Sequence, residues 1–444
     1  MDIKQLYSLY RQYPCITTDS RDCPENSIFV ALKGDSFDGN AFALQALQRG
    51  CRYAIVDDAT LRGEGLIIVD DALQTLKDLA REHRRQFTIP VIAITGTNGK
   101  TTTKELVRAV LAEKYRVLAT EGNFNNDVGV PKTLLRLRPD HEVAVIEMGA
   151  SHPGDIRTLA ETAEPTCGLI TNVGRAHLQG FGSFEGVVRT KGELYDYLRR
   201  RGDGLVFVDA DNDVLVEQIT DEMWVTPYSA DPEKGYACIT GEVLPSTVNS
   251  PFLRFRWRKP LLEQGRSGES QEWHLVETQL VGVYNLQNLL AAVAVGVNFG
   301  VGTEAICHAL EAYRPTNSRS QYMDTGRNRL IVDAYNANPT SMTAALENFA
   351  AIGGSEKMVI LGDMRELGVD SREEHQRIVD CVRRMGIGDA WLVGAEFAKT
   401  DSSFRKFSDV EEVKEELRMR PLEGRLILVK GSHGTRLYEL PVLL

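Results

Sequence analysis

One glycine-rich segment, residues 95–102 with the sequence TGTNGKTT, constrains the fold of this chain more than any other stretch. It follows an apolar run at 91–94 that is typical of a buried parallel strand. Residues 101–115 then carry apolar side chains at helical spacing. A strand, a glycine turn and a helix N-terminus together form a phosphate cradle, because backbone N–H groups and the helix dipole face the anion. The segment therefore predicts a nucleotide-binding α/β domain.

Two side chains of this loop can act on a bound nucleotide. Lys100 is predicted to reach the terminal phosphates of ATP, and the hydroxyl of Thr101 is predicted to ligate Mg²⁺. Only two residues separate the glycines, fewer than in the usual Walker motif, so a plain glycine turn before a helix is the alternative. A lysine and three threonines directly after an apolar strand favour phosphate binding. The phosphate-binding candidates are Gly96, Thr97, Asn98, Gly99, Lys100, Thr101 and Thr102.

Length, charge and cysteine content set the broad class of protein. With 444 residues, the chain is long enough for about three domains of ~150 residues each. A net charge of −11 gives no general attraction to nucleic acid or to an anionic membrane, and no apolar run approaches the ~18 residues of a membrane span. Seven scattered cysteines without a CxxC pair, and no signal peptide, indicate a reducing compartment. We expect a cytoplasmic protein that binds neither nucleic acid nor membrane.

Alternating strand and helix patterns predict an α/β protein of three domains. Residues 1–87 are expected to form a small α/β substrate domain, and residues 88–313 a central P-loop-type domain whose parallel sheet carries helices on both faces. Residues 314–444 are expected to form a doubly wound, Rossmann-like domain. Polar clusters follow several strands of this last domain, and the carboxyl ends of parallel strands meet at one edge, so we expect a binding edge there.

Several further positions in the central domain have open interpretations. Glu147 ends a predicted strand beside the loop, where a carboxylate can ligate Mg²⁺, although a surface glutamate is the alternative. His177 by itself favours a structural histidine, and Lys191, at the expected start of a helix, favours a solvated side chain. Asn285 and Asn288 open an alanine-rich helix, where they either cap the helix or contact an adenine edge; capping is the default.

Taken together, these motifs resemble the Mur ligases of peptidoglycan synthesis, and the resemblance covers essentially the whole chain. The short loop is that family's form of the phosphate motif, and Glu147, His177 and Lys191 fall in the family's order. The segment at 284–288 and the linker at Arg319 also fall in that order. Within the family, four stretches resemble the members that add D-alanyl-D-alanine to UDP-N-acetylmuramoyl-tripeptide, namely 29–39, 122–131, 177–182 and 333–339.

The resemblance implies an ATP-dependent amide ligase that works through an acyl phosphate and acts as a monomer. Two Mg²⁺ ions are implied, one on Thr101 and Glu147 and the other on His177 and a carbamylated Lys191. Lys100 is implied to neutralise the transferring phosphoryl group. The residues implied to hold the adenine, phosphate and ribose of ATP are Asn285, Asn288, Arg319 and Asp333. The implied substrate contacts are Ser20, Arg21 and Lys33 for the UDP end, Asn125 and Asn126 along the sugar nucleotide, and Asn336 and Asn338 in the last domain.

The sequence departs from the family pattern at Gln179, where glutamate is common, and at His433, where arginine often stands. The third peptide residue, diaminopimelate or lysine, is not indicated. Three alternatives compete with this interpretation. A folylpolyglutamate synthase would not be expected to carry the 29–39 stretch, and the Mur ligase that adds the third residue has an Asp-Asn-Pro-Arg motif that is absent here. A nucleotide-binding regulator would leave the metal-site candidates unexplained.

Overall fold

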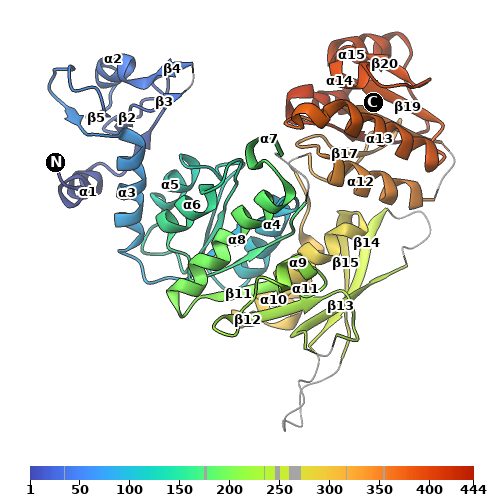
Figure 1. Ribbon diagram of the computed structural model, residues 1–444, viewed down its shortest axis with the longest axis horizontal. Coiled ribbons are helices and arrows are strands. Elements are labelled where there is room, and N and C mark those ends of the chain that lie inside the picture. Colours follow the sequence, from blue (N-terminus) through green and yellow to red (C-terminus); the bar gives the residue numbers. More distant parts are fainter. Residues whose placement is uncertain are drawn as a thin grey trace, which may run out of the picture.

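The computed structural model describes residues 1–34, 36–174, 178–234, 236–245, 251–259, 272–316, 318–353 and 356–444. These residues form α/β units that follow one another along the chain, each built on its own main sheet (Figure 1). The N-terminal unit, in blue, and the C-terminal unit, in red, both contact the central unit and stand apart from each other (Figure 1). Within the described ranges, none of the helices combines the length and the apolar character that a bilayer span requires.

The N-terminal unit holds a parallel sheet of order β1-β2-β5-β6 and a short β3–β4 hairpin. Its last helix, α3, also packs into the apolar core of the central unit through Leu76 and Leu79. Near the end of α3, Arg84 Nε donates a hydrogen bond to the carbonyl of Ala163 at 3.2 Å. The N-terminal unit is therefore anchored to the central unit by a shared helix. Its elements are α1 (Ile3–Gln12), β1 (Ile16–Thr17), β2 (Ile28–Val30), β3 (Lys33–Gly34), β4 (Phe37–Asp38), η1 (Gly39–Phe42), α2 (Ala43–Gln48), β5 (Tyr53–Val56), β6 (Leu66–Ile68) and α3 (Ala72–Arg84).

The central unit is built on a nine-stranded sheet of order β15-β14-β13-β12-β11-β10-β7-β9-β8. The strands from β8 to β13 pair in parallel, and β14 and β15 add an antiparallel extension, as the alternating patterns at 254–258 and 274–280 indicate. Its strands are β7 (Val91–Thr95), β8 (Val117–Ala119), β9 (Val143–Glu147), β10 (Cys167–Ile170), β11 (Leu205–Asp209), β12 (Trp224–Ser229), β13 (Ile239–Leu244), β14 (Phe252–Arg258) and β15 (His274–Val281). Its helices are α4 (Lys100–Ala112), α5 (Gly129–Leu134), α6 (Asp155–Ala163), α7 (Leu178–Phe181), α8 (Phe184–Arg201), α9 (Asp213–Val216), η2 (Val283–Asn285), α10 (Leu286–Asn298) and α11 (Thr303–Ala312).

Helices cover both faces of this sheet, because alternate residues of each buried strand point to opposite sides. In β7, Val91 and Ala93 belong to the apolar cluster that includes α3, α6 and α8. Ile92 and Ile94 belong to the opposite cluster, which includes α4, α10 and α11. The uninterrupted apolar run of β7 is thus the sequence signature of a strand that is buried on both faces.

The C-terminal unit is a six-stranded sheet of order β16-β17-β21-β18-β19-β20, parallel except for the edge strand β16. Two apolar clusters, one on each face, show that it is doubly wound. Its strands are β16 (Gln321–Asp324), β17 (Arg329–Asp333), β18 (Lys357–Gly362), β19 (Asp389–Val393), β20 (Arg405–Phe407) and β21 (Leu426–Lys430). Its helices are α12 (Pro339–Ala351), η3 (Gly368–Asp370), α13 (Ser371–Arg384), α14 (Ala395–Ala398), α15 (Val410–Met419), η4 (His433–Thr435) and η5 (Leu437–Val442).

The predicted fold class is confirmed, with three α/β units of the expected types. One local prediction is wrong: Lys191 lies in the middle of α8, which begins at Phe184, and not at the start of a helix. Ser183 explains the earlier start, because its side chain accepts a hydrogen bond from the N–H of Gly186 and caps the helix. The domain boundaries at 87/88 and 313/314 stay predictions.

Candidate active site

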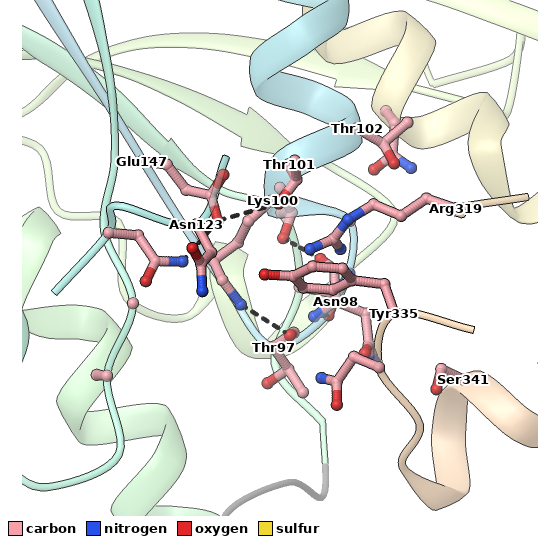
Figure 2. Close-up of a pocket in the computed structure, with 18 of the residues that line it drawn as sticks. Thr97, Asn98, Lys100, Thr101, Thr102, Asn123, Glu147, Arg319, Tyr335 and Ser341 are labelled. Atoms are coloured by element: carbon pink, nitrogen blue, oxygen red, sulfur yellow. Dashed lines mark hydrogen bonds between the residues drawn. The ribbon is translucent and has the colours of Figure 1, made fainter. Parts of the chain in front are cut away.

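A cavity of about 1020 Å³ opens at the carboxyl ends of the central strands, where the predicted loop lies. Side chains from the C-terminal unit form its opposite wall (Figure 2). The cavity brings together most of the predicted site residues, from strand ends, helix starts and the linker at 319. These residues are Thr97, Asn98, Gly99, Lys100, Thr101, Thr102, Asn125, Asn126, Glu147, Asn285, Asn288, Arg319, Asp333 and Asn336.

The two glycines of the loop are required by close contacts. Gly96 has a φ of +142°, and a Cβ there would lie 2.0 Å from Thr171 Oγ1. Gly99 has a φ of +79°, and a Cβ there would lie 2.6 Å from Asn288 Oδ1. The loop backbone therefore lies directly against the end of β10 on one side and against α10 on the other. This arrangement leaves the N-terminus of α4 facing the cavity, as anion binding requires.

Lys100 lies over the loop at the centre of the cavity (Figure 2). Its ammonium donates hydrogen bonds to the carbonyls of Gly96, at 2.7 Å, and Thr97, at 3.0 Å. Desolvation, opposed by Glu147 and aided by the nearby Arg319 guanidinium, lowers the pKa of Lys100 to about 8. Lys100 and Arg319 are thus two cations that line the same cavity. An anion bound between them would reduce their mutual repulsion and compensate for their desolvation.

Glu147 fits the predicted Mg²⁺ site. It is buried at the end of β9, where the Thr101 hydroxyl donates to Oε1 at 3.1 Å and Asn125 Nδ2 donates to the same oxygen at 2.8 Å. The other oxygen, Oε2, is buried and has no hydrogen-bond partner within the described ranges. A carboxylate with one unsatisfied oxygen beside a threonine hydroxyl is the donor set that a hard oxygen-seeking cation prefers. The alternative of a surface glutamate is wrong.

The second predicted metal site can be assessed only in part. His177 lies outside the described residues. Lys191 is 2% exposed, so the interpretation as a solvated lysine is wrong. Burial, with a smaller contribution from Lys100, lowers the pKa of Lys191 to about 7, and its ammonium lies 5.4 Å from the centre of the Phe181 ring. Where the chain is described, no group of three or more His, Cys, Asp or Glu side chains forms a ready metal cluster.

Asn285 and Asn288 do not cap α10 through their side chains, so the default prediction is wrong. Asn285 occupies the N-cap position but donates its amide to the carbonyl of Val281 at 2.9 Å. Asn288 accepts from the Thr103 hydroxyl at 3.0 Å and donates to Asn285 Oδ1 at 2.9 Å. Because Thr103 belongs to α4, this chain of bonds ties the phosphate loop to α10.

The C-terminal unit contacts the loop directly. Asn338 caps α12 and donates its side-chain amide to Asn98 Oδ1 at 2.7 Å. The Arg319 guanidinium lies over the Tyr335 ring, with Cζ 4.0 Å from the ring centre (Figure 2). Asp333, one of the four predicted nucleotide contacts, forms an ion pair with the buried Lys430 at 2.5 Å. Asn336 lines the cavity.

The predicted contacts for the UDP end do not lie in the cavity. Arg21 pairs with Asp19 at 2.8 Å, and Lys33 pairs with Asp57 at 2.8 Å, both in the N-terminal unit. Ser20 accepts a hydrogen bond from Arg49 at its carbonyl. Asn126 lines the cavity, and its Oδ1 accepts from the N–H of Gly129, the first residue of α5, at 2.8 Å. A single substrate that touches these residues and the loop must be elongated.

Sequence reasoning missed three residues of the cavity wall. Tyr335 supports Arg319, Lys430 neutralises Asp333, and Asp209 is a buried carboxyl at the end of β11. Asp209 and Lys430 each lie at the end of a predicted parallel strand. Their position at strand ends is the sequence feature that could have identified them as cavity residues. No pattern in the sequence marks the contact between Tyr335 and Arg319.

Three comparisons relate the chain to known proteins. Family models described as Mur ligase family, catalytic domain, Mur ligase middle domain and Mur ligase, glutamate ligase domain match residues 12–94, 94–296 and 318–433. The UDP-N-acetylmuramoyl-tripeptide–D-alanyl-D-alanine ligase of Bacillus subtilis is 32% identical over 443 residues, which cover 96% of this chain and 92% of that protein. A crystal structure of MurF from Acinetobacter baumannii matches with a TM-score of 0.83 at 30% identity, covering 96% of this chain and 92% of that one. The structure of MurF from Thermotoga maritima in complex with ADP matches with a TM-score of 0.84 at 24% identity. This match covers 97% of this chain and 96% of that one.

The contact of Gly99 with Asn288 generates a prediction about nucleotide binding. Gly99→Ala places a methyl group against an amide that is held by bonds to Thr103 and Asn285, and adds ~1–2 kcal/mol of left-handed strain. We expect ADP affinity, measured by isothermal titration calorimetry, to fall by about tenfold or more.

The control for this variant is Gly202→Ala at the end of α8. Gly202 has a φ of +80°, but nothing lies within 4 Å of a Cβ added at this position, so this variant has the strain without the clash. Equal ADP affinity in the two variants would contradict the steric explanation.

Proposed function

Because the chain belongs to the Mur ligase family, we propose that it joins D-alanyl-D-alanine to UDP-N-acetylmuramoyl-tripeptide, with ATP as the energy source, in peptidoglycan precursor synthesis. One observation in the structure carries the proposal. Lys100, Arg319 and Glu147 converge on a single cavity that also reaches the C-terminal sheet edge. Such a site is built for phosphoryl transfer to an acid, followed by attack of an amine.

The first step forms an acyl phosphate. A carboxylate oxygen of the tripeptide attacks the γ-phosphorus of ATP, the bond from that phosphorus to the β,γ-bridging oxygen breaks, and ADP leaves. The step brings one anion up to another, so neutralisation of charge limits the rate. Lys100 and Arg319 both line the cavity and supply two positive charges to it. Thr101 and Glu147 would hold Mg²⁺, which supplies further positive charge to the phosphates when bound.

The second step forms the amide. The amine of the dipeptide attacks the acyl carbon, the carbon–oxygen bond to phosphate breaks, and the ammonium product loses a proton. The acceptor must therefore reach the cavity while the acyl phosphate is still held there. Polar clusters at the ends of β17, β18 and β21 share one edge, because these strands are parallel neighbours. This edge is the surface from which the dipeptide would approach.

A second cavity of about 880 Å³ lies at the same edge. Arg365 and Glu366 line it, and Glu366 also lines the nucleotide cavity, so the two cavities are adjacent. Arg365 is exposed and crosses Gly434, where an added Cβ would lie 2.2 Å from the guanidinium carbon. An exposed guanidinium is suited to the terminal carboxylate of a dipeptide. We assign Arg365 this role, in addition to Asn336 and Asn338.

The remaining predictions about the protein belong to this proposal. Lys191, buried and without an ion pair within the described ranges, is suited to carbamylation, which would turn it into an oxygen ligand for a second Mg²⁺ with His177.

All seven cysteines are free thiols, which supports a reducing, cytoplasmic location. The UDP end of the substrate is assigned to the loops around Ser20, Arg21 and Lys33, and a monomer stays the expected state.

Lys100→Ala is expected to lower kcat by at least ~10²–10³, because it removes one preorganised charge from the transferring phosphoryl group. Phosphate release measures the rate, and circular dichroism checks the fold. Lys114→Ala, which removes an exposed lysine just beyond the end of α4, is the control. Activity of K100A within a few-fold of K114A would refute the role of Lys100.

Lys191 is expected to carry a carbamate in the active enzyme. After equilibration with ¹³C-bicarbonate, the NMR spectrum should show a carbamate signal that Lys191→Ala abolishes together with activity. The other buried lysines, Lys104 and Lys430, serve as internal controls, because each is held in an ion pair, with Glu105 and Asp333. A spectrum without a carbamate signal in a fully active enzyme would rule the modification out.

The acceptor provides the test of the proposed function. We expect phosphate release with ATP, Mg²⁺, UDP-N-acetylmuramoyl-tripeptide and D-alanyl-D-alanine, little with UDP-sugar dipeptide and diaminopimelate, and none with folate and glutamate. The amide analogue of the dipeptide should be a poor substrate, because it would lose the charged hydrogen bond to Arg365, which is worth ~1.5–3 kcal/mol. Faster turnover on either alternative pair would assign the chain to another Mur-type ligase.

The role of Arg365 is tested in the same assay. Arg365→Ala should raise the KM for D-alanyl-D-alanine by about tenfold or more while leaving ADP affinity unchanged, because a charged hydrogen bond is worth ~1.5–3 kcal/mol. Arg372→Ala, an exposed arginine on α13 that lines neither cavity, is the matched control. An unchanged KM in R365A would remove Arg365 from the acceptor site.

A further inference from the structure

The loop that follows β18, residues 363–367, borders both cavities. Arg365 lines the second cavity, and Glu366 lines the two of them. Met364 and Leu367 are buried in the apolar core of the C-terminal unit, whereas Arg365 and Glu366 are exposed. The buried side chains thus anchor the loop and leave its two charged side chains at the cavities, where the dipeptide is proposed to approach.

Hydrogen bonds hold the backbone of this loop at both ends. The carboxylate of Asp363 accepts from two N–H groups at the start of α14, at 2.9 and 3.0 Å. The N–H of Arg365 donates to Ser432 Oγ at 3.2 Å. Glu366 has a φ of +63°, in the left-handed region that is unfavourable for a residue with a side chain. A loop with such a residue keeps its shape only while its neighbours hold it.

His375, on α13, binds the loop between these two anchors. The N–H of Met364 donates to His375 Nε2 at 3.0 Å, and the histidine is 0% exposed. Because a backbone N–H can only donate, Nε2 must be the unprotonated nitrogen. The proton is therefore on Nδ1, which donates to the carbonyl of Ser371 at 2.6 Å. These two bonds together select the neutral Nδ1–H tautomer.

The groups around His375 leave it neutral. Burial lowers the pKa of His375 below that of an ordinary histidine, and the ammonium of Lys399 acts in the same direction. The Ser371 carbonyl and the carboxylates of Asp363 and Glu396 act against this shift, and Asp363 Oδ1 is 3.7 Å from Nε2. Burial prevails over them. Protonation would place a proton on Nε2 against the backbone N–H of the loop, and the bond to the loop would be lost.

We propose that His375, as its neutral Nδ1–H tautomer, is a positioning residue for the acceptor, because it holds the N–H of Met364 and thereby sets where Arg365 meets the dipeptide. The inference rests on the proposed function, in which Arg365 binds the terminal carboxylate. His375 is fully buried, so it acts through the loop and does not touch the dipeptide. A histidine that merely packed α13 against the sheet would affect stability and leave the acceptor site unchanged.

Two substitutions of His375 test the inference. In His375→Gln the side-chain carbonyl can accept from the N–H of Met364 in place of Nε2, and it does not titrate. In His375→Leu that N–H is left buried and unpaired. His308→Leu, on the exposed side of α11, is the control for the loss of an imidazole. Circular dichroism checks the fold of each variant.

The first experiment uses NMR and needs no substrate. In protein labelled with ¹⁵N-histidine, His375 should show a protonated Nδ1 and an unprotonated Nε2 at neutral pH, with its signals assigned by their loss in H375Q. In protein labelled with ¹⁵N-arginine, the Nε–H signal of Arg365 should shift in H375L and keep its position in H375Q. The Nε2–H tautomer, an imidazolium at neutral pH or an Arg365 signal that H375L does not move would overturn the inference.

The second experiment measures the acceptor. H375L should raise the KM for D-alanyl-D-alanine by about tenfold, the cost of one unpaired buried donor, and leave ADP affinity unchanged. H375Q and H308L should keep the KM within a few-fold of wild type. An unchanged KM in H375L, or an equal rise in H375Q, would contradict the positioning role.

A double mutant separates positioning from a general loss of stability. Because His375 is proposed to act through Arg365, H375L should raise the KM in the wild-type background but add little in R365A. Equal effects of H375L in the two backgrounds would show that the histidine acts elsewhere, and the inference would fail.

The dependence on pH has a definite direction. His375 stays neutral above about pH 6.5, and its protonation as the pH falls further breaks the bond to Met364. The ratio of the wild-type KM to the H375Q KM should therefore rise over the pH range in which NMR shows His375 to titrate. The amine of the dipeptide titrates equally in both assays and cancels in this ratio. A ratio that stays constant across that titration is incompatible with the inference.

These readouts separate the inference from the proposed function. A protein with the Nδ1–H tautomer and an Arg365 signal that depends on His375, but without turnover on D-alanyl-D-alanine, would refute the function and leave the link from His375 to Arg365 standing. An active ligase with the opposite tautomer would refute the inference alone.

Discussion

The close approach of the loop backbone to its two neighbours is the constraint on which the rest of the site depends. Gly96 lies against Thr171 at the end of β10, and Gly99 lies against Asn288 in α10. A side chain at either position would push the loop out of the sheet edge. With the loop held in place, α4 directs its N-terminus at the cavity, and Thr101 meets Glu147 across the end of β9. The charges that phosphoryl transfer requires are thus positioned by backbone packing.

The same packing explains which parts of the molecule the sequence predicts. The phosphate loop and its strand are contiguous, so local spacing is enough to predict them, and buried strands are marked by unbroken apolar runs. Lys191 is different, because its burial results from the packing of α8 with α6 and α7, and nothing adjacent to it in the chain indicates this. Spacing alone therefore favours a solvated lysine, and only the family resemblance suggests its role.

The sequence pattern likewise did not indicate that Asp209 and Gln287 line the cavity. The bond between Gln287 and Asp211 joins residues 76 positions apart, and the choice of amide orientation depends on that bond. Asn285 illustrates the opposite error: an asparagine at a helix start usually caps the helix, but here its Oδ1 accepts from Asn288 Nδ2 and not from a backbone N–H of α10. A long-range hydrogen bond thus determines the orientation of Gln287, whereas the bonds that determine the role of Asn285 lie within four residues of it.

Helix α3 belongs to two units at once, since its apolar face completes the central core while its N-terminal half follows the first sheet. The C-terminal unit joins the loop through polar contacts such as that of Asn338 with Asn98. In the proposed binding mode, the acid that is to be activated would be carried on the same continuous core as the phosphate loop, whereas the amine would arrive from the separate core of the C-terminal unit. Such a division of the two reactants favours an ordered reaction, in which the acyl phosphate forms before the acceptor completes the site.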